Sequence, residues 1–125
     1  MATAKDIMST DVVMIDGNDT VAAAVAKMKE HGTRTLIVDR RNKADAYGIV
    51  TYRDVAYEVV AAGLDPEQVL VHEIMSKPLV VINPDLDVKY VARLFANMGL
   101  SRAPVIAQKK LAGIVSVSDI VNKAV

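Results

Sequence analysis

The sequence predicts an α+β fold built from two copies of one small β-α-β-β-α repeat. Three observations lead to this prediction. A short motif recurs along the chain, the same order of helix and strand patterns follows each copy, and a glycine follows the first helix of each copy. Recurrence at one spacing is the mark of a duplicated unit, so the two halves should share one architecture.

The duplication is visible in two motifs. Asp6-Ile7-Met8-Ser9 returns as Glu73-Ile74-Met75-Ser76, 67 positions later. Gly48-Ile49-Val50-Thr51 returns as Gly113-Ile114-Val115-Ser116, 65 positions later. The two-residue difference lies in a polar turn at Asp39–Ala46, where a change of loop length costs little.

These offsets divide the chain. We assign residues 1–63 to the first repeat, 64–72 to a linker and 73–125 to the second repeat, all within one compact module.

Local signals support each element. In the second repeat Val91, Leu94, Phe95 and Met98 follow the spacing of one helix face. N-caps are expected at Asp19-Thr20 and Asp87, and left-handed C-caps at Gly32 and Gly99. The predicted strands are Val12–Ile15, Thr35–Val38 and Ala46–Val50, then Val80–Ile82, Ala103–Ile106 and Leu111–Val115. A last helix is predicted to start near Thr51 in one repeat and near Ser116 in the other.

A single repeat of this size would leave one face of a small sheet in water, which makes it marginal. We therefore expect the two repeats to pair about a pseudo-two-fold axis, with clefts between the halves.

Taken together, these motifs resemble the CBS-pair family, also called the Bateman module. The resemblance rests on the Ile-Met-Ser starts, the strand Arg102–Ile106, and the segments Gly48–Asp54 and Gly113–Asp119. It implies a regulatory module that binds an adenosine-containing ligand (AMP, ADP, ATP or S-adenosylmethionine) between the repeats. It also implies pairing into a homodimer and signalling to a protein partner that the sequence does not identify.

Thr51-x-x-Asp54 and Ser116-x-x-Asp119 are the first candidate ligand-binding residues. A phosphate suits free N–H groups at a helix start, and a carboxylate can accept from ribose hydroxyls. The same spacing also describes a capping box, in which the two side chains only stabilise the helix start. The residues alone favour capping, whereas duplication and the family resemblance favour nucleotide contact.

Further candidates are basic or apolar. Arg102, Arg34 and Arg53 could face phosphate, or could be solvated surface arginines. Val12 and Leu79 could pack against an adenine ring, although simple core packing explains them as well. Arg102 matches Thr35 in the first repeat, and Arg53 matches Ser118 in the second, so the two clefts should be unequal.

Composition excludes several function classes. Lys+Arg and Asp+Glu are 15 each, and aromatic residues are 4%, which disfavours nucleic-acid and anionic-membrane binding. Cysteine is absent, and His31 and His72 have no second ligand at metal spacing. No nucleophile triad or phosphate-binding loop motif is present. We therefore predict a cytoplasmic protein that is not an enzyme, needs no cofactor and binds no metal.

Two functions remain open. The chain is either an adenine-nucleotide sensor or a ligand-free scaffold that acts through dimerisation or a partner. Apolar helix faces predict the homodimer interface, and their residues are Val55, Val59, Ile120 and Ala124.

Overall fold

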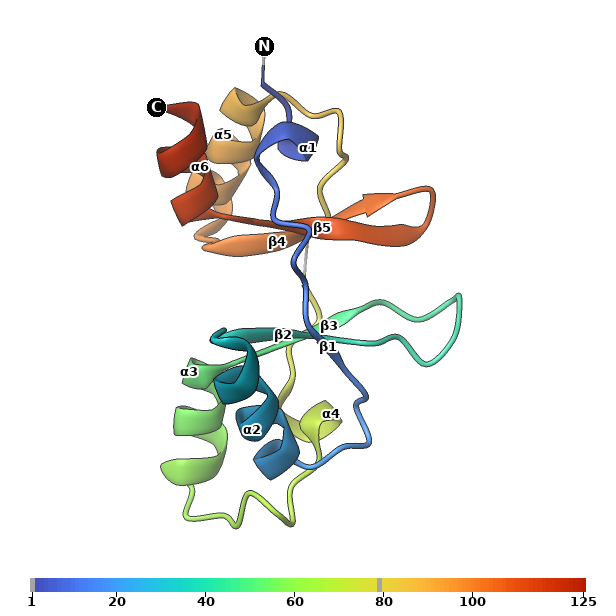
Figure 1. The fold of residues 1–125 in the computed structure, drawn as a ribbon, viewed down its shortest axis with the longest axis vertical. Helices are drawn as coiled ribbons and strands as arrows, with labels where there is room; N and C mark the ends of the chain where they lie inside the picture. Colours follow the sequence, from blue (N-terminus) through green and yellow to red (C-terminus); the bar gives the residue numbers. More distant parts are fainter. Residues whose placement is uncertain (1, 79) are drawn as a thin grey trace. The chain divides into compact units, whose positions relative to one another are not determined.

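The computed structural model describes residues 2–78 and 80–125 (Figure 1). The chain forms two compact units. Unit 1 combines Met1–Val12 with Leu79–Val125, and unit 2 is Val13–Pro78. Both units contain helices and a small sheet, so the predicted α+β fold with two repeats is confirmed.

Unit 2 is built on a three-stranded sheet in the order β1-β2-β3. Strand β1 runs parallel to β2, and β2 runs antiparallel to β3. Its elements are β1 (Met14–Ile15), α2 (Val21–His31), β2 (Thr35–Val38), β3 (Gly48–Thr51), α3 (Tyr52–Val55), the π-helical η1 (Ala56–Val60) and α4 (Val71–Ile74).

Unit 1 contains a two-stranded antiparallel sheet, β4-β5. Its elements are α1 (Ala4–Ile7), α5 (Val88–Met98), β4 (Arg102–Ala107), β5 (Lys110–Ser116) and α6 (Val117–Ala124). The predicted strand Val80–Ile82 is reduced to one parallel bridge between Ile82 and Val105.

A proline accounts for this shortened strand. In unit 2, Ile37 N donates to Val13 O at 3.0 Å, which extends the pairing of β1 with β2. Pro104 occupies the matching position in unit 1 and has no N–H, so it cannot donate to Val80. The first strand therefore keeps its hydrogen bonds only at Ile82.

The predicted helix ends are confirmed. Thr20 accepts a hydrogen bond from Ala23 N at 3.1 Å, and Asp87 accepts one from Lys89 N at 2.8 Å. Gly32 and Gly99 have φ values of 63° and 64°, the left-handed conformation that glycine adopts without strain. The capping residues in the sequence therefore predict both ends of α2 and of α5 correctly.

The segment that opens each sequence repeat packs on the sheet of the other repeat. In unit 1, Ser9 N donates to Ile114 O on β5 at 2.8 Å. In unit 2, Ser76 N donates to Ile49 O on β3 at 2.9 Å. The boundaries 1–63 and 73–125 thus describe the duplicated sequence, whereas the packed units exchange these opening segments.

The cores of the two units are separate and apolar. In unit 1, Ile7 of α1, Phe95 of α5 and Val105 of β4 share one cluster. In unit 2, Met28, Leu36 and Val50 centre one cluster, and Val59 forms a second with Val21 and Val69.

The complete burial of Val59 corrects the predicted dimer face, because this side chain is used inside its own unit. The π-helical turn of η1, in which Ala61 N donates to Ala56 O, contains this residue.

Two glycines permit the exchanged segments to approach the sheets. A Cβ on Gly113 would lie 2.6 Å from the backbone oxygen of Ser9 and 2.8 Å from Met8 Sδ. The atoms nearest to a Cβ on Gly48 would be side-chain atoms, with Met75 Sδ at 2.6 Å and Val38 Cβ at 3.2 Å. The Met75 side chain can move aside, whereas the Ser9 carbonyl is hydrogen-bonded to Ile114 N.

We therefore expect Gly113→Ala to destabilise the protein more than Gly48→Ala. Overpacking against a fixed backbone costs about 1–3 kcal/mol of folding stability. Displacing the flexible Met75 side chain should cost about 1 kcal/mol or less. Urea denaturation of the two variants measures the difference. Equal losses of stability would show that the backbone contact at Ser9 is not the limiting one.

Candidate functional site

The predicted site residues Thr51 and Asp54 form a complete capping box where β3 ends and α3 begins. Thr51 N donates to Asp54 Oδ2 at 2.9 Å, and the Thr51 hydroxyl donates to the same oxygen at 3.1 Å. Asp54 N donates back to Thr51 Oγ1 at 3.3 Å. The capping alternative is therefore realised, and it orients the carboxylate rigidly.

The second junction repeats this geometry. Ser116 N and its hydroxyl donate to Asp119 Oδ2 at 2.9 and 3.0 Å, and Asp119 N donates to Ser116 Oγ at 3.2 Å. Both aspartates are half-buried. The duplicated motif thus folds into two local sites with nearly identical hydrogen bonds.

The two junctions differ at the second carboxylate oxygen. Lys123 Nζ lies 3.3 Å from Asp119 Oδ1 and also donates to Ile7 O at 3.0 Å. The residue matching Lys123 in the first repeat is Glu58, which is acidic. No salt bridge or hydrogen bond reaches Asp54 Oδ1 from the described residues. Asp54 therefore keeps one whole oxygen for a further donor.

The expectation of several free N–H groups at the helix starts is wrong. Tyr52 N donates to Arg34 O at 3.1 Å, and Val117 N donates to Ser101 O at 2.9 Å. Since Asp54 N and Asp119 N serve the capping boxes, one N–H group remains in each first turn, at Arg53 and at Ser118. One N–H group is a weak phosphate site, so any phosphate would need side-chain cations.

Arginines lie next to both junctions. Arg102 is the strand partner of Ser116, which places it beside the second junction. Arg34 lies beside the first junction, because its backbone oxygen accepts the hydrogen bond from Tyr52 N, and its side chain is exposed. The exposed Arg53 guanidinium lies over the Tyr57 ring, 5.3 Å from the ring centroid. Val12 is half-buried at the end of the opening segment of unit 1. Leu79 lies outside the described residues.

A pocket that the sequence did not indicate opens at the other end of the sheet in unit 2. The pairs Thr35–Thr51 and Val38–Gly48 are the two ends of the β2–β3 ladder, with the Asp54 junction at the first end and the pocket at the second. Its volume is about 490 Å³. The lining residues are Asp16, Gly17, Asn18, Val38, Asp39, Arg40, Arg41, His72, Met75 and Lys77.

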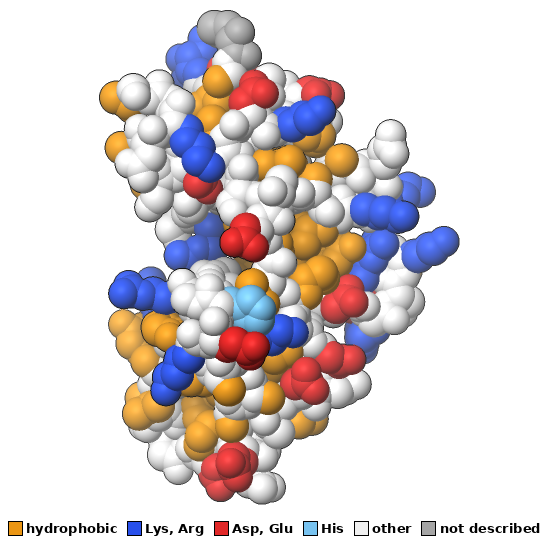
Figure 2. All heavy atoms as spheres, in the orientation of Figure 1, with side chains coloured by type: hydrophobic (Ala, Val, Ile, Leu, Met, Phe, Trp, Pro, Cys, Tyr) orange, Lys and Arg blue, Asp and Glu red, His pale blue; other side chains and the backbone are white. Residues whose placement is uncertain are grey.

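Residues from three separate segments line this pocket, which explains why no local motif predicts it. Met75 and Lys77 come from the exchanged opening segment, and His72 is the linker residue directly before it. His72 N donates to Gly17 O at 2.9 Å. Figure 2 shows basic and acidic side chains close together on the surface of unit 2. In the sequence, the adjacent basic residues Arg40 and Arg41 could have pointed to this region, although neither was predicted as a site residue.

Asp45 organises the hairpin beside the pocket. It accepts from Arg41 N at 3.0 Å and from Arg41 Nε at 3.3 Å, and Lys77 Nζ lies 3.2 Å away. Lys77 Nζ also donates to Ala46 O. The hydrogen bond from Arg41 N, followed by that from Lys77, holds the pKa of Asp45 far below its ordinary range.

The same family model, described as CBS domain, matches the chain over residues 4–61 and 71–125. This chain belongs to the CBS domain family. Each matched range contains one capping-box junction with its Gly-Ile-Val-(Thr/Ser)-x-x-Asp motif.

Two relatives align with nearly all of this CBS chain. It is 33% identical over 120 residues to CBS domain-containing protein YhcV of Bacillus subtilis, covering 96% of this chain and 84% of that protein. It is 31% identical over 118 residues to uncharacterized protein MK0525 of Methanopyrus kandleri, covering 94% of this chain and 60% of that protein.

The hexameric CBS-CP12 protein from bloom-forming cyanobacteria is 55% identical, with a TM-score of 0.90. That comparison covers 97% of this CBS chain and 67% of the cyanobacterial one. This chain therefore spans only part of some of its relatives.

Across residues 2–78 and 80–125, no three His, Asp or Glu side chains gather in a way that could hold a metal ion. Within the same ranges no helix has the length and apolar character required to cross a membrane.

The lowered pKa of Asp45 leads to a pH-dependent prediction. Its folded value lies below the ordinary value of 3.8, so its stabilising effect is present above that pH and is lost as pH falls through the folded value. Lys77→Gln should raise the pKa of Asp45 and lower stability at neutral pH, with the difference from wild type shrinking in acid. Carboxyl NMR titration and urea denaturation at several pH values measure both effects.

Lys43→Gln is the matched control, because Lys43 is exposed on the same hairpin, whereas the ion pairs of Asp45 are with Arg41 and Lys77. It should leave the Asp45 titration unchanged. If both variants shift that titration equally, general charge and not the Lys77 contact controls the pKa of Asp45.

Proposed function

We propose that this CBS-domain chain is a regulatory module that binds an adenosine-containing ligand at its strand-to-helix junctions, with the Asp54 junction as the stronger site. The ligand class is AMP, ADP, ATP or S-adenosylmethionine. The observation that carries the proposal is the half-buried Asp54 carboxylate, which the capping box orients while Oδ1 keeps its full capacity to accept.

Ribose suits this arrangement. Two adjacent hydroxyls can donate to one carboxylate, as acidic residues accept from ribose in other nucleotide sites. Because Asp54 Oδ2 is held by Thr51, the carboxylate does not have to be ordered when the ligand binds. This pre-ordering lowers the entropic cost of binding. Thr51 therefore acts by positioning Asp54 and not by contacting phosphate.

Arginine side chains beside the junction can bind the phosphate groups of the ligand. Arg34 and Arg53 flank the start of α3, and both side chains are exposed. A guanidinium offers several donors in a plane that matches phosphate oxygens. The presence of two arginines compensates for the nearly complete use of backbone N–H groups at this helix start.

The Ser116 junction should bind the same ligand more weakly. Lys123 already occupies Asp119 Oδ1, and a ribose hydroxyl must compete with it. The lysine is 46% exposed, and such surface pairs contribute no more than about 1 kcal/mol, so the competition is modest. The two sites should therefore differ in affinity because of Lys123, and also because Arg53 and Arg102 have no basic counterpart in the other repeat.

Scaffolding is the second candidate function. One observation favours it: both Thr/Ser-x-x-Asp motifs form capping boxes, and stabilising a helix start is by itself a sufficient role for the motif. A structural neighbour, the CBS-CP12 protein, is a hexamer, which illustrates assembly by a related chain. Under either function the proposal assigns no catalysis to the chain. A cytoplasmic location and a protein partner also remain proposals.

The ligand proposal predicts that Asp54→Asn weakens AMP or ATP binding about tenfold to a hundredfold, because a charge-assisted acceptor is lost. Asp119→Asn should have a smaller effect. Lys123→Gln should strengthen binding at the second junction by no more than about fivefold, the equivalent of one surface ion pair. Isothermal titration calorimetry of wild type and variants measures these changes.

Glu58→Gln is the positional control for Lys123→Gln, since the two residues match in the duplicated sequence. It removes a negative charge one turn from Asp54 and removes no partner of Oδ1. Absence of adenosine-ligand binding to wild type at millimolar concentration would contradict the ligand proposal and make scaffolding the leading function. Unchanged binding to Asp54→Asn would refute the ribose role while leaving nucleotide binding open.

We further propose a homodimer that buries the exposed apolar surface of the junction helices. On η1, Tyr57 and Val60 are 63% and 71% exposed, and on α6, Val121 is 53% exposed. Val121→Glu should give a monomer, because an unpaired carboxylate in an apolar interface is costly. Val81→Glu is the control, since Val81 is 56% exposed but lies outside the helices. Light scattering that gives a monomer for wild type would contradict the dimer.

A further inference from the structure

The pocket of unit 2 contains two carboxylates at the ends of neighbouring parallel strands. Asp16 follows β1 and Asp39 follows β2, and Asp39 N donates to Ile15 O at 2.9 Å. One oxygen of each is used locally: Asp16 Oδ1 accepts from Asn18 N at 2.8 Å, and Asp39 Oδ1 accepts from Arg40 N at 2.9 Å. No salt bridge to either carboxylate occurs within residues 2–78 and 80–125.

Asp16 and Asp39 directly follow the paired strand residues Ile15 and Val38, and two exposed like charges on neighbouring strands favour a positively charged ligand group. Both aspartates line the pocket, so a ligand ammonium inside it could approach them together. Ligands commonly bind beyond the carboxyl ends of parallel strands in open sheets, which is where these side chains lie.

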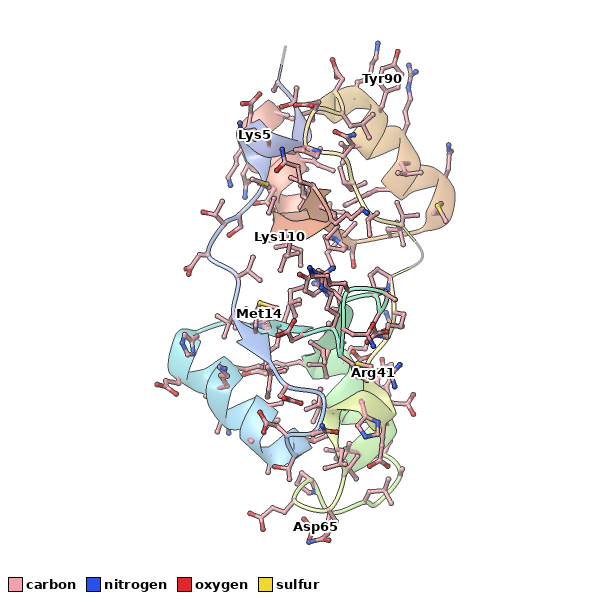
Figure 3. The ribbon with its side chains drawn as sticks, turned by 90° about the vertical axis from the view of Figure 1, so that its right-hand side faces the viewer. Lys5, Met14, Arg41, Asp65, Tyr90 and Lys110 are labelled. Carbon is pink, nitrogen blue, oxygen red and sulfur yellow. The ribbon has the colours of Figure 1, made fainter. Side chains whose placement is uncertain are left out.

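Hydrogen-bond donors enter the same pocket from the hairpin and from the segment after α4. The Asp45 carboxylate accepts hydrogen bonds from Arg41 Nε and from Lys77 Nζ, and Ala46 O accepts a second hydrogen bond from Lys77 Nζ. The terminal nitrogens of Arg41 and the third Lys77 proton retain donor capacity, since a guanidinium has five N–H groups and an ammonium has three. In Figure 3, Arg41 lies on this hairpin, away from Asp65 in the turn before α4.

Charge balance restricts the ligand. Arg40, Arg41 and Lys77 carry three positive charges, and Asp16, Asp39 and the adjacent Asp45 carry three negative charges. A phosphate ester would bring uncompensated negative charge into this neutral group, whereas a zwitterion brings one charge of each sign.

The pocket volume of about 490 Å³ lies in the range of small-molecule sites. Val38 and Met75 add apolar surface for a side chain.

We propose that this pocket binds a free α-amino acid with an apolar side chain. The ligand ammonium donates to Asp16 and Asp39, and its carboxylate accepts from Arg41 and Lys77. The side chain packs against Val38 and Met75. This site is separate from the proposed nucleotide junction, because the two lie at opposite ends of the β2–β3 ladder. The module would then respond to two chemically different ligands, an adenosine compound and an amino acid.

Leucine is the probe, and two analogues isolate its charges. Isocaproate has the same skeleton without the ammonium, and isoamylamine has it without the carboxylate. In amide-resolved NMR titrations of the whole protein, leucine should shift the signals of Gly17, Asn18 and Arg41 with a dissociation constant of about 0.1–10 mM. Each analogue should bind about tenfold more weakly or worse, because one charged set of hydrogen bonds is missing.

Variants then assign the residues. Asp39→Asn and Arg41→Gln should each weaken leucine binding about tenfold. Glu30→Gln and Lys43→Gln are matched controls on exposed residues of unit 2 outside the pocket, and they should bind leucine as wild type does. Asp54→Asn should also leave leucine binding unchanged, which separates this site from the nucleotide junction.

The proposal is overturned if leucine shifts none of these amides at about 10 mM. It is also overturned if either analogue binds as well as leucine, or if ribose phosphate shifts the same amides at lower concentration. Since the analogue comparison uses wild-type protein, the proposal remains testable even if a pocket variant fails to fold.

Discussion

The structure depends on the pairing of each repeat's opening segment with the last strand of the other repeat's sheet. Ser9 pairs with Ile114 in unit 1, and Ser76 pairs with Ile49 in unit 2. Each pairing needs a close approach over a glycine, Gly113 or Gly48. Because of this exchange neither unit is a continuous sequence repeat, and each apolar core contains residues from both.

The same exchange creates the features that distinguish the two units. In unit 1 it brings Ile7 O to Lys123, which also contacts Asp119. In unit 2 it brings His72, Met75 and Lys77 to the carboxyl ends of β1 and β2, where they complete the pocket. A duplicated sequence thus yields two units that share the capping-box junctions but differ in the polar side chains around them.

The capping boxes show that a structural role and a binding role are compatible. One oxygen of each aspartate stabilises the helix start, and the other is available or is held by a surface lysine. A helix cap contributes about 1 kcal/mol of stability, which is enough to order the carboxylate before a ligand arrives. Helix capping and ligand contact are therefore compatible roles for Asp54, because they use different carboxylate oxygens.

The sequence by itself determined the duplication, the helix caps at Thr20 and Asp87, the left-handed glycines and the strand-to-helix junctions, because each depends on residues within a few positions of one another. It also identified Asp54 and Asp119 as the carboxylates to test. Tertiary structure alone decided the burial of Val59, the use of the N–H groups at the helix starts, the Lys123 contact and the pocket. These depend on contacts between distant segments, and neither hydrophobic period nor local propensity encodes which segment crosses to which sheet.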